Sequence, residues 1–156
     1  QTIVVARRDL IKFFSISDPK IVVCGLNPHA GENGSLGNED LKVIKPTILK
    51  LQEEGVSIKG PLSADSLFHS EARNKYDCVV GMYHDQVLPV VKALDFTKTV
   101  NITLGLDFIR TSPDHGTAYD IAGKNIANAE SLIAAINTAE TMSNTSLKFA
   151  DAANKF

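Results

Sequence analysis

What this sequence of 156 residues lacks already limits the kind of protein it encodes. No apolar run approaches the roughly 20 residues that a helix needs to cross a bilayer. The first residues, Gln1–Val5, lack the basic and then apolar pattern of a signal peptide. Basic charge is not in excess either, since the formal net charge is −2, and a nucleic-acid-binding surface is therefore not expected. These absences favour a cytoplasmic protein that binds neither membranes nor nucleic acids.

Cysteine is scarce as well, and both copies, Cys24 and Cys78, lie in apolar segments. Two buried, reduced thiols are the simpler interpretation, and a disulfide is the alternative. The sequence has no initiating methionine, so we expect it to start inside a longer protein, although processing or cloning would give the same start. With 44% hydrophobic and 22% charged residues, the composition is ordinary for a globular protein. We expect residues 1–156 to form a single compact unit.

Strand-like and helix-like segments alternate along the chain, which predicts an α/β fold with a mixed or parallel sheet flanked by helices. Apolar, β-branched runs predict strands at 21–24, 56–58, 78–82 and 100–104. Helical spacing predicts helices at 38–54, 63–68, 84–94 and 129–149, and loops are expected at 27–37 and 112–116. The apolar stripe expected on the last helix consists of Leu132, Ile133, Ile136, Ala139 and Met142.

Two histidines follow predicted buried strands. His29 lies in the glycine-rich loop after strand 21–24, and His84 comes just after strand 78–82 with Asp85 beside it. Ligand sites in open α/β sheets gather where strands end, and histidine with a carboxylate neighbour suits metal binding. The alternatives are a solvated His29 and a helix cap at position 84. A shared metal site would need a further ligand, for which Asp65 and Asp85 are candidates, as is a residue outside this chain.

Other polar residues suit an anionic ligand or a cofactor. Lys92 and Arg110 offer positive charge, and Asn101 is a polar residue within a predicted strand. In the polar, glycine-containing segment 112–124, Asp120 is a candidate to accept hydrogen bonds from a ribose diol. Pattern alone leaves open that the two basic residues are solvated surface charges and that the loop is only a connection.

Five motifs make the chain recognisable. They are CGLNPHAGE at 24–32, GPLSADSLF at 60–68, MYHDQ at 82–86, VNITLGL at 100–106 and FIRTS at 108–112. Together they closely resemble the 4-hydroxythreonine-4-phosphate dehydrogenase family, in the same order and over nearly the whole chain. The resemblance implies an isocitrate/isopropylmalate dehydrogenase-like fold, of which residues 1–156 would be the C-terminal part of a longer NAD-dependent dehydrogenase.

The resemblance also implies a reaction, which is the oxidation and decarboxylation of 4-phosphooxy-L-threonine in vitamin B6 (pyridoxal phosphate) biosynthesis. It implies NAD, a divalent metal (zinc, magnesium or cobalt), and a homodimer with its active site at the interface. By the family's pattern His29 and His84 would bind the metal. The substrate would be bound by Lys92, Asn101 and Arg110, and catalytic roles would fall to Asp65 and Lys92.

A further resemblance concerns segment 115–123, which is similar to the adenosine-binding loop of isopropylmalate dehydrogenases. It implies that the cofactor is bound by His115, Gly116, Asp120 and Ile121. Two departures from the family stand out: its third metal-binding histidine lies in an N-terminal part absent here, and Val87 stands where glycine is expected. The missing ligand favours one alternative, a catalytically incomplete metal- or phosphate-binding fragment. The other alternative is a dehydrogenase of phosphothreonate or phosphoerythronate, whose metal and NAD motifs would be the same.

Overall fold

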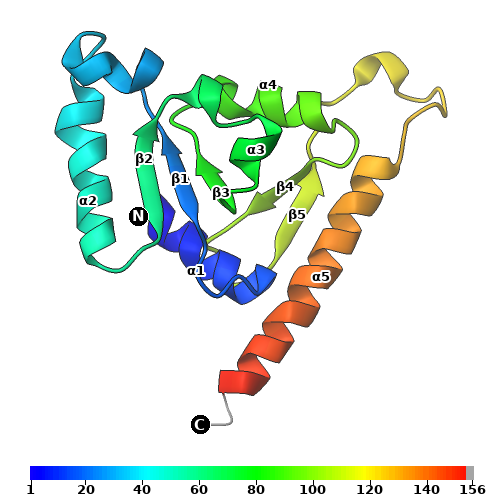
Figure 1. Cartoon of the computed structure of the whole chain (residues 1–156). Helices are drawn as coiled ribbons and strands as arrows, with labels where there is room; N and C mark the ends of the chain where they lie inside the picture. Colours follow the sequence, from blue (N-terminus) through cyan, green and yellow to red (C-terminus); the bar gives the residue numbers. More distant parts are fainter. Residues whose placement is uncertain (154–156) are drawn as a thin grey trace. The chain divides into compact units, whose positions relative to one another are not determined.

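The structure, a computed structural model, describes residues 1–153 and confirms the predicted α/β fold (Figure 1). The helices are α1 (Thr2–Phe14), α2 (Lys45–Glu53), α3 (Ser70–Arg73), α4 (His84–Leu94) and α5 (Glu130–Ala153). The strands are β1 (Ile21–Cys24), β2 (Ile58–Leu62), β3 (Cys78–Val80), β4 (Val100–Thr103) and β5 (Arg110–Pro113). Short 3-10 turns occur at Pro28–Gly34, Ala64–Ser66 and Tyr119–Ile121, and a π-helical turn at Asp40–Ile44 leads into α2.

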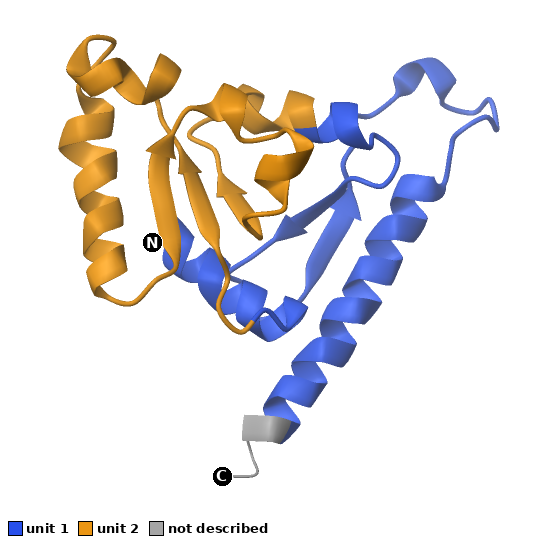
Figure 2. Ribbon diagram, in the orientation of Figure 1, with its two compact units in different colours: residues 1–16, 91–156 blue, residues 17–90 orange. Residues whose placement is uncertain are grey.

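The chain divides into two compact units where the sequence suggested one (Figure 2). The central unit is Ser17–Val90, and the terminal unit combines Gln1–Ile16 with Val91–Phe156. Two distant ends of the sequence share the terminal unit because α1 packs against α5. That long-range contact leaves no mark on local sequence patterns, so the division was not visible from the sequence.

The central unit is built on a three-stranded parallel sheet in the order β2-β1-β3. All four residues of the middle strand β1 are buried, as expected for a strand that is covered on both faces. Strand β2 starts two residues after the predicted position and continues to Leu62. The sequence did not predict this extension, because lysine, glycine and proline interrupt the apolar pattern of the strand. The predicted helix at 63–68 is only a 3-10 turn, and α3 follows it.

Cys24 belongs to the buried core of this sheet, and Cys78 lies on the neighbouring strand β3. Cys24 is fully buried and packs with Val22 and Leu67, and Cys78 is half-buried on the adjacent strand β3. Both thiols are free, as predicted. Burial raises the pKa of each thiol, which keeps it protonated and unreactive at neutral pH.

The terminal unit holds an antiparallel pair, β4 and β5, packed against α5. Strand β5 corrects the loop predicted from Ser112 onward: Ser112 pairs with Asn101, and Pro113 pairs with Val100 at the end of the ladder. Serine and proline favour turns locally, and the strand forms here because its partner β4 and helix α5 stabilise it. Helix α1 was not anticipated from the sequence.

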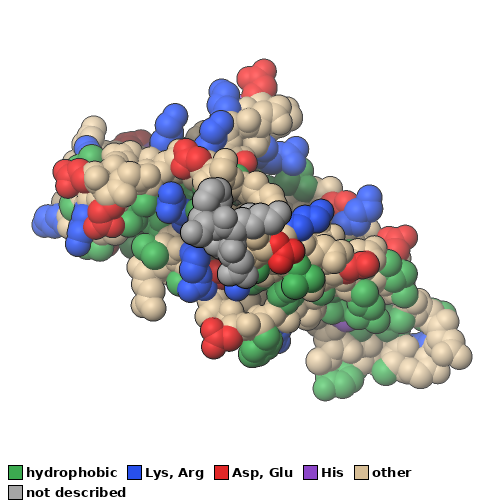
Figure 3. Space-filling model, turned by 90° about the horizontal axis from the view of Figure 1, so that it is seen from below, with side chains coloured by type: hydrophobic (Ala, Val, Ile, Leu, Met, Phe, Trp, Pro, Cys, Tyr) green, Lys and Arg blue, Asp and Glu red, His purple; other side chains and the backbone are tan. Residues whose placement is uncertain are grey.

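Helix α5 corrects the predicted apolar stripe in part, since Met142 is buried as expected and three other members are not. Its buried residues include Ala135 and Met142, whereas Leu132, Ile133 and Ile136 are more than half exposed. The helix places a small residue against the strands, where Thr111 Oγ1 donates a hydrogen bond to the Ala135 carbonyl at 2.9 Å. Figure 3 shows hydrophobic side chains on the surface, interspersed with charged and other groups. Despite this apolar surface, no helix among the described residues combines the length and hydropathy needed to cross a membrane.

Candidate functional site

The two predicted metal-binding histidines lie just beyond the ends of neighbouring strands. Strands β1 and β3 pair in parallel, so the loops that follow them leave the sheet at the same edge. His29 belongs to the turn Pro28–Gly34 after β1, and His84 is the first residue of α4 after β3. Both belong to the central unit. Their placement after strand ends agrees with the sequence prediction.

The loop that carries His29 has an unusual backbone. Five successive residues, His29 to Asn33, have positive φ angles between 41° and 79°. Residues other than glycine avoid this left-handed region, at a cost of roughly 1–2 kcal/mol each. A Cβ at Gly25 would lie 2.6 Å from the Ala30 Cα, so the loop folds back closely over the end of β1. Such a conformation persists only where surrounding contacts hold it.

Asp40 anchors the residues just before this loop, although the sequence analysis gave it no role. Its carboxylate is 1% exposed. Its Oδ1 accepts a hydrogen bond from the Leu26 backbone N–H at 2.9 Å, and its Oδ2 accepts one from the Asn27 N–H at 3.0 Å. The sequence signal for this role was weak: Asp40 is an acidic residue on the inward-facing side of the helix predicted at 38–54. Asp40 therefore fixes the start of the loop that carries His29.

Each histidine ring has a carboxylate at its Nδ1 atom. The distance from His29 Nδ1 to Glu32 Oε1 is 2.9 Å, and from His84 Nδ1 to Asp85 Oδ1 it is 2.6 Å. Both pairs are largely exposed to solvent, so they add little to folding stability. Their effect is on orientation and tautomer, because a proton held at Nδ1 leaves the Nε2 lone pair free for a metal ion. An imidazole nitrogen of this kind is a ligand that divalent metals such as zinc accept.

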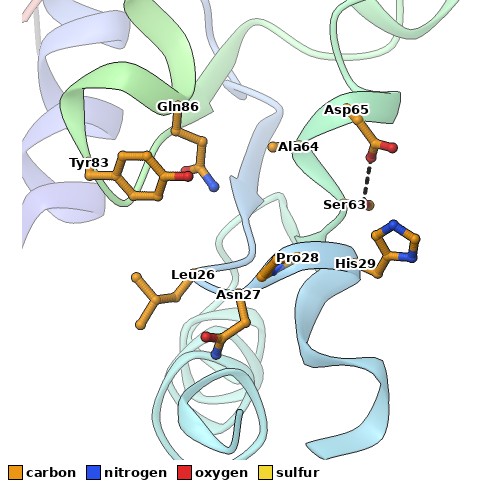
Figure 4. Close-up of a pocket in the computed structure, with 9 residues that line it drawn as sticks. All are labelled: Leu26, Asn27, Pro28, His29, Ser63, Ala64, Asp65, Tyr83 and Gln86. Atoms are coloured by element: carbon orange, nitrogen blue, oxygen red, sulfur yellow. Dashed lines mark hydrogen bonds between the residues drawn. The ribbon is translucent and has the colours of Figure 1, made fainter. Parts of the chain in front are cut away.

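A cavity of about 270 Å³ lies beside His29 in the central unit (Figure 4). Asp65 lines it, and the Ser63 hydroxyl donates a hydrogen bond to this carboxylate at 2.5 Å. That bond, with a smaller contribution from His29, lowers the pKa of Asp65 and keeps it ionised at neutral pH. His84 does not line the cavity. Within residues 1–153, no three histidine, cysteine or acidic side chains gather into a metal cluster.

Gln86 is a second residue that the sequence analysis missed. It lines the same cavity as His29, next to Tyr83 in Figure 4. Its side-chain amide donates to the Gly25 carbonyl oxygen at 2.7 Å and accepts from the Met82 backbone N–H at 2.8 Å. Its position in the motif MYHDQ was the available signal, but a hydrogen bond to a residue 61 positions away cannot be deduced from spacing.

The predicted substrate-binding residues all lie in the terminal unit. In the β4–β5 ladder Asn101 pairs with Ser112 and Thr103 pairs with Arg110, which puts Asn101 and Arg110 on the same face. Arg110 Nη1 donates to the Thr103 hydroxyl at 2.8 Å. The opposite face of the pair is the one on which Thr111 contacts α5. The exposed face therefore offers an amide and a guanidinium side by side.

Lys92 is held by an acidic partner. Its Nζ lies 3.6 Å from Asp114 Oδ2 and 5.6 Å from the centre of the Phe96 ring. Lys92 is 31% exposed and Asp114 is 20% exposed. Lys92 is thus paired and partly buried, unlike the solvated surface lysine that was the alternative interpretation. Asp114 had received no individual role from the sequence.

The predicted cofactor-binding residues meet only in part. A cavity of about 680 Å³ in the terminal unit is lined by His115, Gly116 and Ile121. Its walls are mainly apolar, and they include Phe96. Asp120 is not among the lining residues. The cavity is large enough for a planar aromatic group with a sugar attached.

Known proteins resemble this chain over most of its length. Residues 1–139 match the family described as pyridoxal phosphate biosynthetic protein PdxA. The 4-hydroxythreonine-4-phosphate dehydrogenase of Xanthobacter autotrophicus is 53% identical over 91% of this chain and 41% of that protein. The enzyme of the same name from Vibrio vulnificus YJ016 is 55% identical over 86% of this chain and 42% of its own length. The chain thus spans less than half of these relatives.

Solved structures of dehydrogenases also resemble this chain. A crystal structure of 4-hydroxythreonine-4-phosphate dehydrogenase from Klebsiella pneumoniae matches with a TM-score of 0.78 and 42% identity, covering 90% of this chain and 42% of that one. A terephthalate 1,2-cis-dihydrodiol dehydrogenase from Burkholderia xenovorans matches with a TM-score of 0.67 and 33% identity, covering 88% and 43%. Both similarities extend through the two units.

Proposed function

The chain belongs to the PdxA family of pyridoxal phosphate biosynthetic proteins, and from this premise we propose that it is part of a 4-hydroxythreonine-4-phosphate dehydrogenase. The proposed enzyme is cytoplasmic, depends on NAD and a divalent metal, and oxidises and decarboxylates 4-phosphooxy-L-threonine in vitamin B6 biosynthesis. Its fold would be of the isocitrate/isopropylmalate dehydrogenase type, and it would act as a homodimer with the active site at the interface. These properties are proposed for the longer protein, since the chain spans 41% of the relative from Xanthobacter.

The observation that carries the proposal is the matched pair of histidine–carboxylate contacts. His29 and His84 each turn Nδ1 toward a carboxylate and keep Nε2 available, at the same edge of the sheet. Two imidazoles suit zinc or cobalt, and magnesium would need more oxygen ligands. A third protein ligand and the substrate's own oxygens would complete the coordination.

When bound, the metal would supply Lewis acidity at the substrate hydroxyl, and NAD would accept the hydride. The chain's own residues bind and orient. Arg110 presents a planar fork that matches phosphate or carboxylate oxygens, and Asn101 on the same face adds an amide donor. Lys92 adds a positive charge, and its ammonium group forms an ion pair with Asp114. These three residues support an anionic, phosphorylated substrate.

Asp65 and Lys92 are the proposed catalytic residues. Asp65 is ionised at neutral pH and lines the cavity beside His29, where it can accept a hydrogen bond or a proton from the substrate. For the cofactor, the cavity lined by His115, Gly116 and Ile121 is proposed to take the adenosine of NAD. Asp120 would bond the ribose hydroxyls from just outside that lining.

The decisive test is NADH formation by the intact enzyme with divalent metal and either 4-phosphooxy-L-threonine or phosphothreonate. Faster turnover of 4-phosphooxy-L-threonine supports the proposal. Preference for phosphothreonate would instead support the related sugar-acid dehydrogenase, and failure with both would contradict a dehydrogenase role. His84→Ala should abolish metal-dependent turnover. His69→Ala, which removes an exposed histidine of the central unit, should leave it unchanged.

A further inference from the structure

Lys92 is held by two groups of the terminal unit that also border the proposed cofactor cavity. Its Nζ atom lies 3.6 Å from Asp114 Oδ2 and 5.6 Å from the centre of the Phe96 ring. Phe96 lines the cavity of about 680 Å³. Asp114 directly precedes His115 and Gly116, which line the same cavity. One wall residue and the neighbour of two others therefore hold the ammonium group.

We propose that Asp114 is a positioning residue that couples this cavity to Lys92, so that cofactor and phosphorylated substrate strengthen each other's binding. This coupling rests on the proposed function, which assigns Lys92 to the substrate and the cavity to the adenosine of NAD. It goes beyond that function, because it concerns the dependence of one ligand's affinity on the other. Asp114 does not line the cavity and acts through Lys92.

The geometry of the ion pair leaves Lys92 able to bind an anion. A separation of 3.6 Å between Nζ and Oδ2 is too long for a hydrogen bond, so the three N–H donors of the ammonium group remain available to substrate oxygens. Both side chains are partly buried, and solvent therefore screens their attraction less than it screens a fully exposed pair. Asp114 thus fixes the place of the ammonium group without occupying its donors.

A cofactor in the cavity would restrict both groups that hold Lys92. Phe96 is 62% exposed, so a flat ring system that enters the cavity would cover part of it. Contacts with His115 and Gly116 would order the backbone next to Asp114. An ammonium group whose supports are already ordered loses less freedom when substrate binds, which strengthens substrate binding. Such coupling is reciprocal, so substrate strengthens cofactor binding by the same factor.

The coupling is measured in the intact enzyme as the factor by which 4-phosphooxy-L-threonine tightens the binding of NADH, followed by NADH fluorescence. NADH cannot accept a hydride, so this ternary complex does not react. Coupling between two sites commonly changes affinity by about 5- to 150-fold, and we expect a factor in that range for the unmodified enzyme. Asp114→Asn should remove most of the factor, because the amide keeps the shape and loses the charge. Asp114→Glu keeps the charge and should restore part of it.

Two further variants separate the coupling from a general effect on the fold. Glu54→Gln is the matched control, because Glu54 Oε1 also pairs with a lysine, Lys50 Nζ at 4.0 Å, but belongs to the central unit. It should keep the full factor. Lys92→Ala should lose the factor as Asp114→Asn does, and combining these two substitutions should have no further effect. Thermal unfolding without ligands shows whether each variant keeps its fold.

The coupling is supported if Asp114→Asn loses the factor at unchanged thermal stability while Glu54→Gln keeps it. It is overturned if Asp114→Asn keeps the full factor, or if the unmodified enzyme oxidises the substrate and yet shows no factor. Retention of the factor by Lys92→Ala overturns it as well, whatever the stability of the Asp114 variants. An enzyme that forms no NADH from NAD, divalent metal and either phosphorylated substrate would contradict the proposed function itself, and the coupling with it.

Discussion

Asp40 binds Asn27 twice: its carboxylate Oδ2 accepts hydrogen bonds from the Asn27 backbone N–H at 3.0 Å and from the side-chain Nδ2 at 3.2 Å. The other oxygen accepts from the Leu26 N–H. Three donors thus satisfy a carboxylate that is almost completely buried. This cluster anchors Leu26 and Asn27, which lead into the left-handed loop that presents His29.

Asp40→Asn should therefore destabilise the central unit. The new NH₂ group would face backbone N–H donors, and an unsatisfied buried donor costs about 1–3 kcal/mol. Urea unfolding of the chain measures the change. Asp18→Asn, an exposed substitution in the same unit, is the control and should be close to neutral. Equal effects of the two substitutions would show that Asp40 does not hold the loop.

Asp9 should make stability depend on acid pH. Burial opposes its ionisation, but hydrogen bonds from Arg8 Nε at 2.7 Å and from the Gly105 N–H at 2.7 Å outweigh burial and lower its pKa. The folded state then binds fewer protons than the unfolded state, so this contribution is complete above about pH 4 and is lost as the pH falls further.

Asp9→Asn is the corresponding test, with unfolding free energies measured between neutral pH and pH 3. The stability difference between the unmodified chain and Asp9→Asn should be largest near neutral pH and shrink in acid. Asp18→Asn again serves as the comparison. A difference that stays constant with pH, or grows in acid, would contradict the assigned direction of the Asp9 pKa shift.

Helix α5 should tolerate truncation on one face and not on the other. Met142 is 1% exposed and Ile136 is 56% exposed. Met142→Ala should cost about 2–5 kcal/mol, the usual range for a buried large-to-small change, whereas Ile136→Ala should cost far less. Urea unfolding of both variants checks this. A similar loss for Ile136→Ala would show that a contact covers the exposed face.

Arg110 should affect substrate capture in the intact enzyme. Charge-assisted hydrogen bonds contribute about 1.5–3 kcal/mol, so Arg110→Ala should lower kcat/KM for 4-phosphooxy-L-threonine by roughly tenfold or more. Arg110→Lys should recover part of the loss, because it keeps the charge and loses the planar fork. Arg73→Ala removes an exposed arginine and is the control. Unchanged kinetics for Arg110→Ala would remove this residue from the proposed substrate site.

The sequence by itself determined the α/β class, the buried strand β1, the strand β3 and the helix α4 with His84 at its start. These elements are encoded locally, by apolar β-branched runs and by helical spacing. The same locality placed both histidines after strand ends. The family resemblance added roles for these residues that spacing alone left open.

Tertiary structure decided the rest. Strand β5 forms because β4 pairs with it. The exposed side of α5 is set by the contact of Ala135 with Thr111 of that strand. Asp40 and Gln86 have their roles through hydrogen bonds to residues 13 and 61 positions away. Local patterns carry no information on such partners, because a side chain's hydrogen bonds depend on where the folded backbone brings distant polar groups.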